Sequence, residues 1–553
     1  MDYKRLFTSS KNDLGIEAII FYLKKLHSEI HQYITDGGCC IQGDQIENYF
    51  EELKNTKLSD DPVDTDVVLE EIAALTAGLP IWNHPGTMLN VIPPVNLAAT
   101  AAGTLMDVLN VNYSQGHYSG NLMLAELKVV KYISDLVGWD WRKSAGLFTF
   151  GGKGTSLYAL KNAINRAYPE GQENGYDKRF FFLSSIKGHP CHAEVAEWLG
   201  IGKKSCIRVG TSDDGKVRIE EAEEIIKKHI EKGEIFIGCI LSGGSTVEYE
   251  VDNVREVRTL MNHVQKLYGL SYCPWIHVDS VVGWPWLFYN GYDFEANELQ
   301  VSERVKQKIQ SMNSDISGIV EADSFGVDFH KTGFCPYVSS LFMCRMKDEL
   351  RYVSNRFERR NTDICLEEYS PFEYSLELTR SGKGAISALV ALETMGKNGY
   401  RQLIADMLDT VDDLRKRLSE LPFVELLNLD ARGFATLFVM KPPEYADLSL
   451  DSLLRLPMED TEKIKKYNVL FGNYIGELVK QNQTFVNFTS TDAFAVNNTN
   501  IYLGMVKVYP MSVLGSHETN EEFIRELCRL KEQFDSSDKD KIKSNSPTDM
   551  VYR

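Results

Sequence analysis

The chain has 553 residues, of which 43% are hydrophobic and 25% charged, and its net charge at pH 7 is −18. This length suggests two or three domains with ample material for a core. The negative charge argues against nucleic acid or an anionic membrane surface as the main partner.

Neither targeting nor redox signals stand out. The first residues carry no apolar stretch of signal-peptide length, and no run of about 18 apolar residues predicts a membrane span. The ten cysteines are scattered without a Cys-x-x-Cys pair, so neither a zinc site nor a disulfide framework is suggested. We therefore expect a cytoplasmic protein with reduced thiols and no bound metal.

The N-terminal region has helical patterns. Apolar residues at helical spacing predict an amphipathic helix over residues 15–33 and further helices over residues 44–53 and 65–75. We expect these helices to form a separate segment over residues 1–82.

A glycine-rich turn near residue 151 links a short apolar stretch to a helical pattern that extends to residue 166. Free N–H groups at such a helix start, with Gly152 and the hydroxyls of Thr155 and Ser156, can cradle a phosphate. The alternative is a serine or threonine that only caps the helix.

Apolar strands with polar ends then alternate with helices. Strands are predicted over residues 179–185, 235–246 and 276–283, and a helix over residues 254–268. This alternation indicates a parallel sheet with helices on both faces. Polar groups at the strand ends then converge on one crevice, where such folds bind ligands.

Two residues at strand ends suggest a particular chemistry. Lys331 follows His330 at the end of a β-like stretch, just before residues that break regular structure. A lysine fixed in this way can form a Schiff base, although a single lysine is more often a solvated surface residue. Asp279 ends a buried strand and needs a cationic partner. A protonated pyridine nitrogen is such a partner, so the pair suggests pyridoxal phosphate (PLP).

The stretches HVDSVVG (277–283) and DSFGVDFHK (323–331) resemble the group II PLP-dependent amino-acid decarboxylases, the family of glutamate, aromatic amino-acid and histidine decarboxylases. The resemblance implies the α/β fold type I of PLP-dependent aminotransferases. Its large domain, expected over residues 83–380, has a mostly parallel seven-stranded sheet flanked by helices. A small α+β domain is expected over residues 381–534, before a polar tail, 535–553, that we expect to be disordered.

The resemblance also implies the roles of individual residues. Lys331, His189 and Asp279 are the expected catalytic residues: Lys331 forms the Schiff base, His189 stacks on the ring, and Asp279 pairs with the ring nitrogen. Counting back from Gly200 and Gly202 favours His189 for stacking, with His192 as the competitor. The expected cofactor-binding residues are Gly152, Thr155, Ser156, His189, Ser242, Asp279, His330 and Lys331, and Asp252 matches a further family aspartate.

The chain departs from the family near the substrate mouth. The family's acidic-small-proline motif is replaced by HYSGN at residues 117–121, although Glu126 stays in register. In the C-terminal domain, Gly504 stands where the family has an arginine. The loss of this cation, and the room that a glycine leaves, favour an apolar or bulky substrate side chain.

A second departure concerns a loop. In the family, a mobile loop within residues 345–381 carries a tyrosine that protonates the substrate carbon after CO2 leaves. Phe357 falls at or near the expected position, and Tyr352 and Tyr369 are the nearest tyrosines. Family members that replace this tyrosine can form an aldehyde and consume oxygen.

Three functions remain open. The favoured one is a carboxy-lyase that converts an L-amino acid or a derivative into an amine and CO2. The second is another PLP reaction, either oxidative decarboxylation–deamination to an aldehyde or carbon–carbon cleavage as in related lyases. The third is a non-enzymatic PLP-fold protein, although retention of both Lys331 and Asp279 argues against it. The resemblance also implies a homodimer with active sites at the subunit interface.

Overall fold

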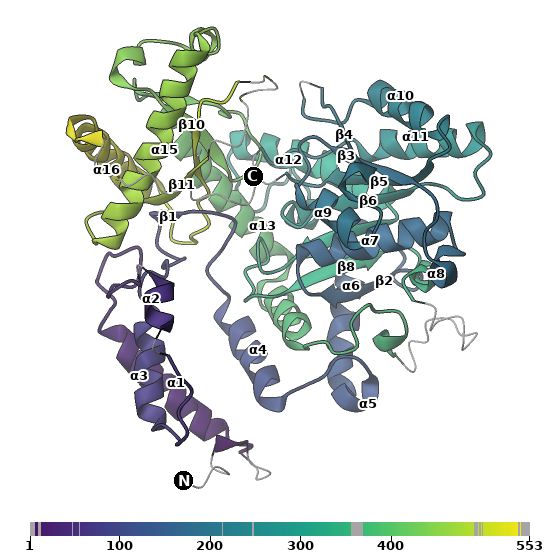
Figure 1. The fold of residues 1–553 in the computed structure, drawn as a ribbon, viewed down its shortest axis with the longest axis horizontal. Helices are drawn as coiled ribbons and strands as arrows, with labels where there is room; N and C mark the ends of the chain where they lie inside the picture. Colours follow the sequence, from purple (N-terminus) through teal and green to yellow (C-terminus); the bar gives the residue numbers. More distant parts are fainter. Residues whose placement is uncertain are drawn as a thin grey trace. The chain divides into compact units, whose positions relative to one another are not determined.

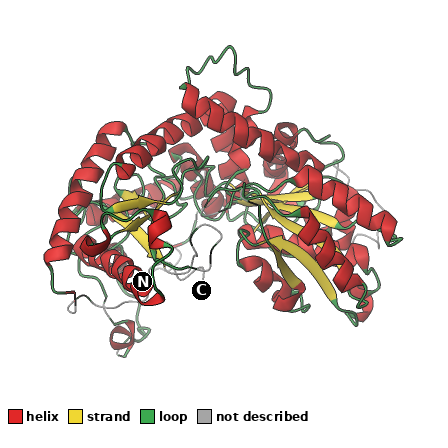
Figure 2. Ribbon diagram, turned by 90° about the horizontal axis from the view of Figure 1, so that it is seen from above, coloured by secondary structure: helices red, strands yellow, loops and turns green. Residues whose placement is uncertain are grey.

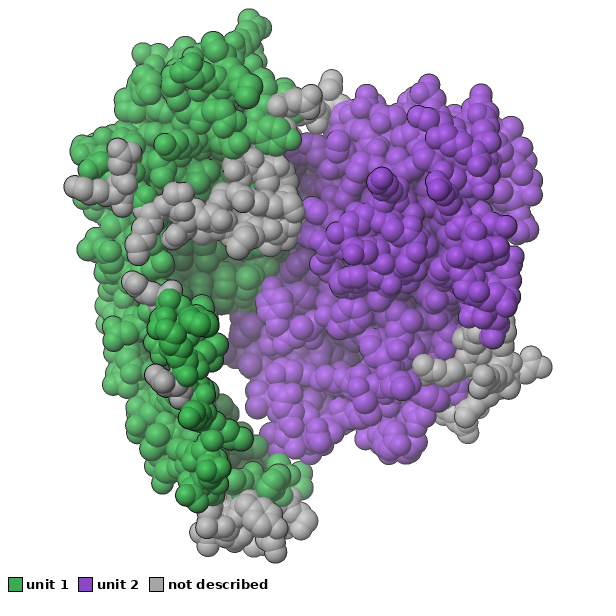
Figure 3. Space-filling model, viewed as in Figure 1, with its two compact units in different colours: residues 1–94, 410–429, 436–553 green, residues 95–409, 430–435 purple. Residues whose placement is uncertain are grey.

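The computed structural model describes residues 6–8, 13–46, 48–54, 56–212, 214–245, 248–354, 369–491, 496, 499, 501–539 and 542. The chain divides into two compact units (Figures 1 and 3). Unit 1 comprises Met1–Pro94, Thr410–Leu429 and Thr436–Arg553, and unit 2 comprises Val95–Asp409 and Asp430–Ala435.

Unit 2 is built on a seven-stranded sheet with the order β2-β8-β7-β6-β5-β3-β4. Its strands are β2 (Ala145–Thr149), β3 (Phe180–Ser185), β4 (Cys206–Val209), β5 (Ile235–Ser242), β6 (Trp275–Asp279), β7 (Ser324–Asp328) and β8 (Ser340–Cys344). The pairs from β4 to β7 are parallel, and β8 runs antiparallel to both β7 and β2. The predicted fold class, a mostly parallel seven-stranded α/β sheet, is therefore confirmed.

Helices lie on both faces of this sheet (Figure 2). The helices of unit 2 are α4 (Leu97–Leu109), α5 (Gly116–Ser119), α6 (Leu124–Val137), α7 (Gly152–Ala167), α8 (Gly171–Asn174), α9 (Cys191–Trp198), α10 (Ile219–Ile230), α11 (Val254–Leu267), α12 (Glu303–Ile316) and the first part of α13 (Lys383–Ser419). Short 3-10 helices are η2 (Gly120–Met123), η3 (Lys203–Ser205), η4 (Trp284–Tyr289), η5 (Ser317–Glu321), η6 (Lys347–Tyr352) and η7 (Pro371–Glu373). Because β3, β5, β6 and β7 are covered on both faces, almost all of their residues are buried.

Unit 1 contains a five-stranded sheet with the order β1-β11-β12-β10-β9. Its strands are β1 (Thr87–Met88), β9 (Val424–Leu426), β10 (Thr436–Met440), β11 (Asn487–Thr491) and β12 (Met505–Val508). Its helices are α1 (Ile16–His31), α2 (Tyr49–Leu53), α3 (Thr65–Ala74), α14 (Leu450–Leu453), α15 (Met458–Lys480), α16 (His517–Ser536), η8 (Pro443–Tyr445) and the end of α13. A core that includes Leu414, Phe438, Phe471, Val506 and Leu530 joins this sheet to its helices.

Some local expectations need correction. The second predicted helix begins at Tyr49, five residues later than expected, because the side chain of Asn48 accepts from Phe50 N and Glu51 N and so caps the helix there. Phe357 and most of the expected tail, 540–541 and 543–553, lie outside the described residues. Among the residues that are described, no helix is long and apolar enough to cross a membrane.

The expectation that Gly504 leaves room for a substrate is also wrong. Gly504 has a φ of +65°, a left-handed conformation that favours glycine. A Cβ at this position would lie 2.9 Å from the backbone oxygen of Lys465. The backbone therefore excludes an arginine here, and the space beside the glycine is filled.

Candidate active site

Asp279 ends β6 on the face of the larger sheet that α7 covers. The strand register places it directly opposite Ser242 of β5 and Gly326 of β7. A Cβ on Gly326 would lie 2.5 Å from Thr155 Oγ1 of α7, so this glycine lets the helix approach the sheet. The ends of β5, β6 and β7 thus bring polar groups to the start of α7.

The carboxylate of Asp279 is held by His192, a fully buried residue of α9. His192 Nε2 lies 3.1 Å from Asp279 Oδ2, and its Nδ1 lies 2.8 Å from Ser184 Oγ. Burial lowers the pKa of His192, so the ring is neutral at pH 7 and donates its Nε2 proton to the carboxylate. Burial alone would raise the pKa of Asp279, but the hydrogen bond from His192, with a weaker contribution from the positive charge of Lys331, brings it below its ordinary value.

His189 lies in the turn before α9 and has different surroundings. It is partly exposed, and its Nδ1 accepts from Cys191 N at 3.1 Å. Burial lowers the pKa of His189 to about 4, and charges on Asp279 and Lys331 act on it more weakly. His192 is therefore committed to Asp279, whereas His189 lies within electrostatic range of the lysine.

Lys331 lies in the turn after β7 with 25% of its side chain exposed. Its Nζ lies 3.0 Å from Oδ2 of Asp328, the last residue of β7. Burial disfavours the charged amine, but attraction to Asp328 and Asp279 outweighs it and raises the pKa of Lys331. The neighbouring His330 is buried, and its ring packs against that of Tyr337 with a centroid distance of 4.2 Å.

The start of α7 is open to an anion. Its N-cap is Gly151, with a φ of 137° and no side-chain cap, so the alternative of a simple serine or threonine cap is wrong. Thr155 Oγ1 donates to Gly152 O at 2.8 Å. Ser156 Oγ is buried and has no hydrogen-bond partner among the described residues. Unpaired N–H groups and this hydroxyl can together hold a phosphate.

The end of β5 is fixed by Asp252. The backbone N–H of Ser242 donates to Asp252 Oδ2 at 2.7 Å, and that of Val217 donates to Oδ1 at 3.1 Å. Burial raises the pKa of Asp252 to about 7, although both hydrogen bonds oppose the rise. Asp252 therefore sets the position of the strand end that carries Ser242.

Three residues near the site were not predicted: Asp328, Ser340 and Arg208. Asp328 is 1% exposed and has the same signal as Asp279, an acid at the end of a buried strand. Arg208 of β4 donates to Ser184 Oγ at 2.9 Å and to His189 O at 3.0 Å. An isolated arginine in a strand gives no sequence signal, because this clamp forms only when β3 and β4 pair.

The tyrosines nearest the family's loop position are both engaged elsewhere. Tyr369 is buried, and its hydroxyl donates to Glu126 Oε1 at 3.1 Å. Glu126 also pairs with Arg380 in a buried ion pair. The hydroxyl of Tyr352 accepts from Arg351 at 3.1 Å. Tyr369 is therefore part of a buried charge network.

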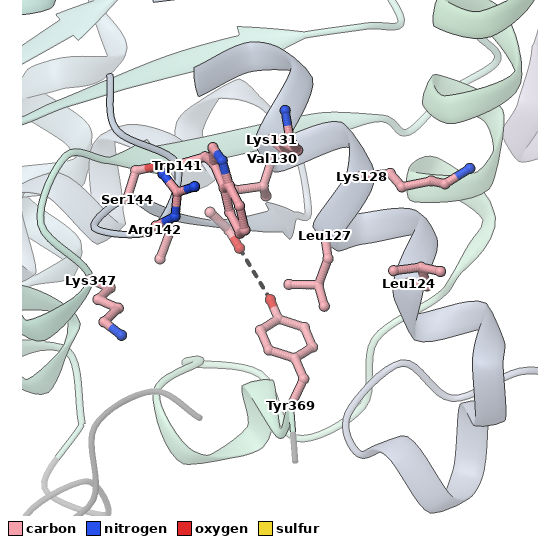
Figure 4. Close-up of a pocket in the computed structure, with 12 residues that line it drawn as sticks. Leu124, Leu127, Lys128, Val130, Lys131, Trp141, Arg142, Ser144, Lys347 and Tyr369 are labelled. Atoms are coloured by element: carbon pink, nitrogen blue, oxygen red, sulfur yellow. Dashed lines mark hydrogen bonds between the residues drawn. The ribbon is translucent and has the colours of Figure 1, made fainter. Parts of the chain in front are cut away.

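Tyr369 also borders an apolar pocket of about 330 Å³ (Figure 4). Its hydroxyl lies 3.4 Å from Gly146 O of the edge strand β2. The pocket is lined by Leu124, Leu127, Lys128, Val130, Lys131, Trp141, Arg142, Ser144, Ala145, Gly146, Lys347 and Tyr369. None of the expected catalytic residues lines it, so this pocket is separate from the lysine site.

Comparison with known proteins identifies the family and the fold. The family described as "Pyridoxal-dependent decarboxylase conserved domain" matches residues 48–439. The L-2,4-diaminobutyrate decarboxylase of Rhizobium meliloti (strain 1021) is 22% identical over 330 residues, which are 59% of each protein. The chain thus matches less than two thirds of the length of this curated relative.

Two solved structures show the same fold. Mouse CSAD in its apo form has a TM-score of 0.74 at 16% identity, covering 93% of this chain and 99% of that one. Rhodiola rosea 4-hydroxyphenylacetaldehyde synthase has a TM-score of 0.69 at 13% identity, and the match covers 97% of this chain and 100% of that one. These likenesses show the fold, and the family match shows the class of protein. The chain belongs to the pyridoxal-dependent amino-acid decarboxylases, which are carboxy-lyases.

The residues present fit the cofactor of this family. Asp279 Oδ1 is buried and has no hydrogen-bond partner among the described residues, as an acceptor for a protonated ring nitrogen requires. Ser156 Oγ is a second buried group without a partner, next to the open start of α7. Lys331 supplies the amine on the same side of the sheet.

Proposed function

We propose that this protein decarboxylates an L-amino acid, or an amino-acid derivative, to the amine and CO2, with Lys331 as the residue that carries PLP. The observation that supports this most is that the Lys331 amine lies within electrostatic range of Asp279, whose Oδ1 is buried and without a hydrogen-bond partner among the described residues. A purely structural role would require neither group.

In this proposal each side chain has one task. PLP supplies an electron sink when bound. Asp279, kept ionised by His192, holds a proton on the ring nitrogen through Oδ1. The start of α7 and Ser156 would bind the phosphate, and Ser242 and His330 would bind the cofactor at the ends of β5 and β7. His189, neutral above about pH 4, would contact the cofactor without adding charge.

A second candidate is oxidative decarboxylation–deamination, which gives an aldehyde. The observation in its favour is that Tyr369 is committed to Glu126 in a buried network. The sequence of residues 355–368 contains no tyrosine that could replace it. The fold itself is compatible with both outcomes, since an aldehyde synthase is among the structural neighbours.

Product analysis separates these functions. The purified, PLP-loaded protein is incubated with single amino acids while CO2, oxygen uptake, amine and aldehyde are measured. The proposal predicts CO2 and amine in equal amounts without oxygen uptake. Aldehyde with oxygen consumed would establish the second candidate, and cleavage without CO2 would indicate another lyase.

We also propose that the protein is a homodimer. Among the described residues, α1 and α2 contain no buried side chain. In α2, Tyr49, Phe50 and Leu53 are 71%, 69% and 65% exposed, which is unusual for apolar residues grouped on a short segment. We expect a second copy of the chain to bury these apolar side chains. Light scattering should give twice the chain mass, and Phe50→Ser with Leu53→Ser should weaken the dimer; a fully active monomer would contradict the proposal.

The location that we propose is the cytoplasm. All nine cysteines in the described part of the chain are free, as expected where thiols stay reduced.

Because Gly504 leaves no open space, the preference for an apolar or bulky substrate side chain now rests only on the missing arginine.

A further inference from the structure

The site contains a second buried carboxylate, Asp328. It ends β7 two residues after Gly326 and therefore points to the same face of the sheet as Asp279. Its side chain is 1% exposed. A buried carboxylate is costly unless a cation or several donors compensate it, so its neighbours determine what it does.

Asp328 is fixed by a hydroxyl and faces one cation. Ser340 Oγ of β8 donates to Asp328 Oδ1 at 2.5 Å. The other oxygen, Oδ2, lies 3.0 Å from Lys331 Nζ and makes no hydrogen bond of ordinary geometry among the described residues. A Cβ on Gly152 would lie 2.9 Å from Oδ2, so only glycine at the start of α7 leaves space for this carboxylate.

His330 does not supply the compensating charge. Its Nε2 lies 3.5 Å from Asp328 Oδ2, beyond ordinary hydrogen-bond distance. Its Nδ1 lies 3.0 Å from Ser339 O, at the distance of a donor to a carbonyl. Burial lowers the pKa of His330, so the ring is neutral at pH 7. Lys331 is therefore the cation that compensates Asp328.

We infer that Asp328 is a positioning residue that acts through Lys331, by keeping a proton on the Nζ atom of that lysine. Ser340 aims the carboxylate at Nζ. The other titratable groups that act on Nζ are Asp279 and Tyr337. Asp279 is engaged by His192, so Asp328 is the acid in direct contact with the lysine nitrogen.

Asp328 would have the same role in the PLP-loaded protein. An amine must lose a proton to form a Schiff base, and the nitrogen of the resulting imine must carry a proton for the imine carbon to be a good electrophile. Asp328, which lies 3.0 Å from Nζ of the free lysine, would favour the protonated nitrogen in both states. This part of the inference rests on the proposed function of Lys331, whereas the protonation of the free lysine does not.

The first test uses the full chain freed of cofactor. Acetylation of the Lys331 peptide by acetic anhydride is measured by mass spectrometry across a pH series, for wild type and Asp328→Asn. The amide can still accept from Ser340 but carries no charge. We expect the pH midpoint of Lys331 labelling to fall by at least about one pH unit, because an opposite charge at this distance shifts a pKa by about 1–3 units.

The controls are matched to this contact. Asp107→Asn removes the partner of Lys383 from an exposed ion pair of 2.7 Å in the same unit, and should leave the Lys331 midpoint unchanged. Ser340→Ala should shift the midpoint in the same direction as Asp328→Asn, but less. If Asp328→Asn does not fold, the Lys331 midpoint of Ser340→Ala alone tests the inference.

The second test follows the visible absorption of the PLP-loaded protein against pH. The midpoint between its protonated and deprotonated bands should fall in Asp328→Asn. Unchanged midpoints in both tests would overturn the inference. A shift in the first test with no PLP band in any variant would instead overturn the proposed function and leave the role of Asp328 intact.

Discussion

His192 on α9 donates from Nε2 to Oδ2 of Asp279, at the end of β6, across 3.1 Å. The other oxygen of this carboxylate is buried without a hydrogen-bond partner among the described residues. One oxygen is thus used to fix the side chain, and the second is left for a ligand.

This division of roles predicts different effects of two substitutions. Asp279→Asn keeps the shape but removes the charge, so turnover should fall by a factor of about 100 or more, on the scale of lost electrostatic stabilisation. His192→Gln should weaken PLP binding and lower turnover less, because the carboxylate remains. Circular dichroism checks folding, and PLP titration followed by steady-state kinetics separates affinity from turnover. Unchanged turnover in Asp279→Asn would remove its assigned role.

The turn that carries His189 should depend on Arg208. This guanidinium donates to the carbonyls of Ser185 and His189 at 3.0 Å each, so it holds both ends of the turn. Arg208→Ala should raise the KM for substrate and lower PLP affinity, while the internal fold of unit 1 is unaffected. Arg208→Lys should recover little, since one ammonium cannot reach both carbonyls. Wild-type kinetics in Arg208→Ala would contradict this assignment.

The buried pair of Glu126 and Arg380 should be important for stability. Glu126 is 0% exposed and also accepts from Phe148 N at 3.0 Å. Glu126→Gln leaves Arg380 buried without its counter-ion, which should cost about 3–5 kcal/mol in the free energy of unfolding. Urea denaturation measures this loss. Lys128→Gln, which removes an exposed ion pair from the same helix, is the matched control and should change little.

Stability should decline on acidification because of buried histidines. Burial lowers the pKa of His189 to about 4 and that of His277 to about 3. Below about pH 6.5 the unfolded chain binds protons that the native state does not, so the free energy of unfolding falls between about pH 6.5 and 4. Asp252, with a pKa raised to about 7, has the opposite sign: its native state keeps the proton, so stability falls as the pH rises from about 4 to 7.

Variants isolate the histidine contribution. His277→Asn should lose less stability than wild type when the pH is lowered from 7 to 5, as measured by urea denaturation at each pH. Asp252→Asn should lose more, because its opposing contribution is removed. The same pH dependence in all three proteins would show that these groups do not titrate as described.

The sequence predicts β3, β5 and β6 of the larger sheet because their apolar residues lead to a polar end, whereas no strand is predicted where β4 and β8 lie. The same reasoning selects Asp279 and Lys331 as candidate site residues. His189 and His192 are separated only by Pro190 and Cys191, so the sequence does not tell their surroundings apart, whereas in the fold only His192 is hydrogen-bonded to Asp279. The pairing of β1 with β11 joins segments 400 residues apart and leaves no local pattern.

The contact of Asp328 with Lys331 could not be predicted from the sequence, for a different reason. Its position three residues before Lys331 is evident in the sequence, but whether its carboxylate reaches the amine depends on the turn after β7. Likewise, Gly504 reads as a missing arginine, whereas its positive φ and the nearby backbone of Lys465 account for the glycine.

The most direct measurement reduces the PLP-loaded protein with borohydride, digests it, and locates the pyridoxyl group by mass spectrometry. The proposed site predicts one modified peptide, with the label on Lys331, and no label in Lys331→Ala. A label on another lysine, or an unchanged labelled fraction in Lys331→Ala, would contradict the site on which the proposed function depends.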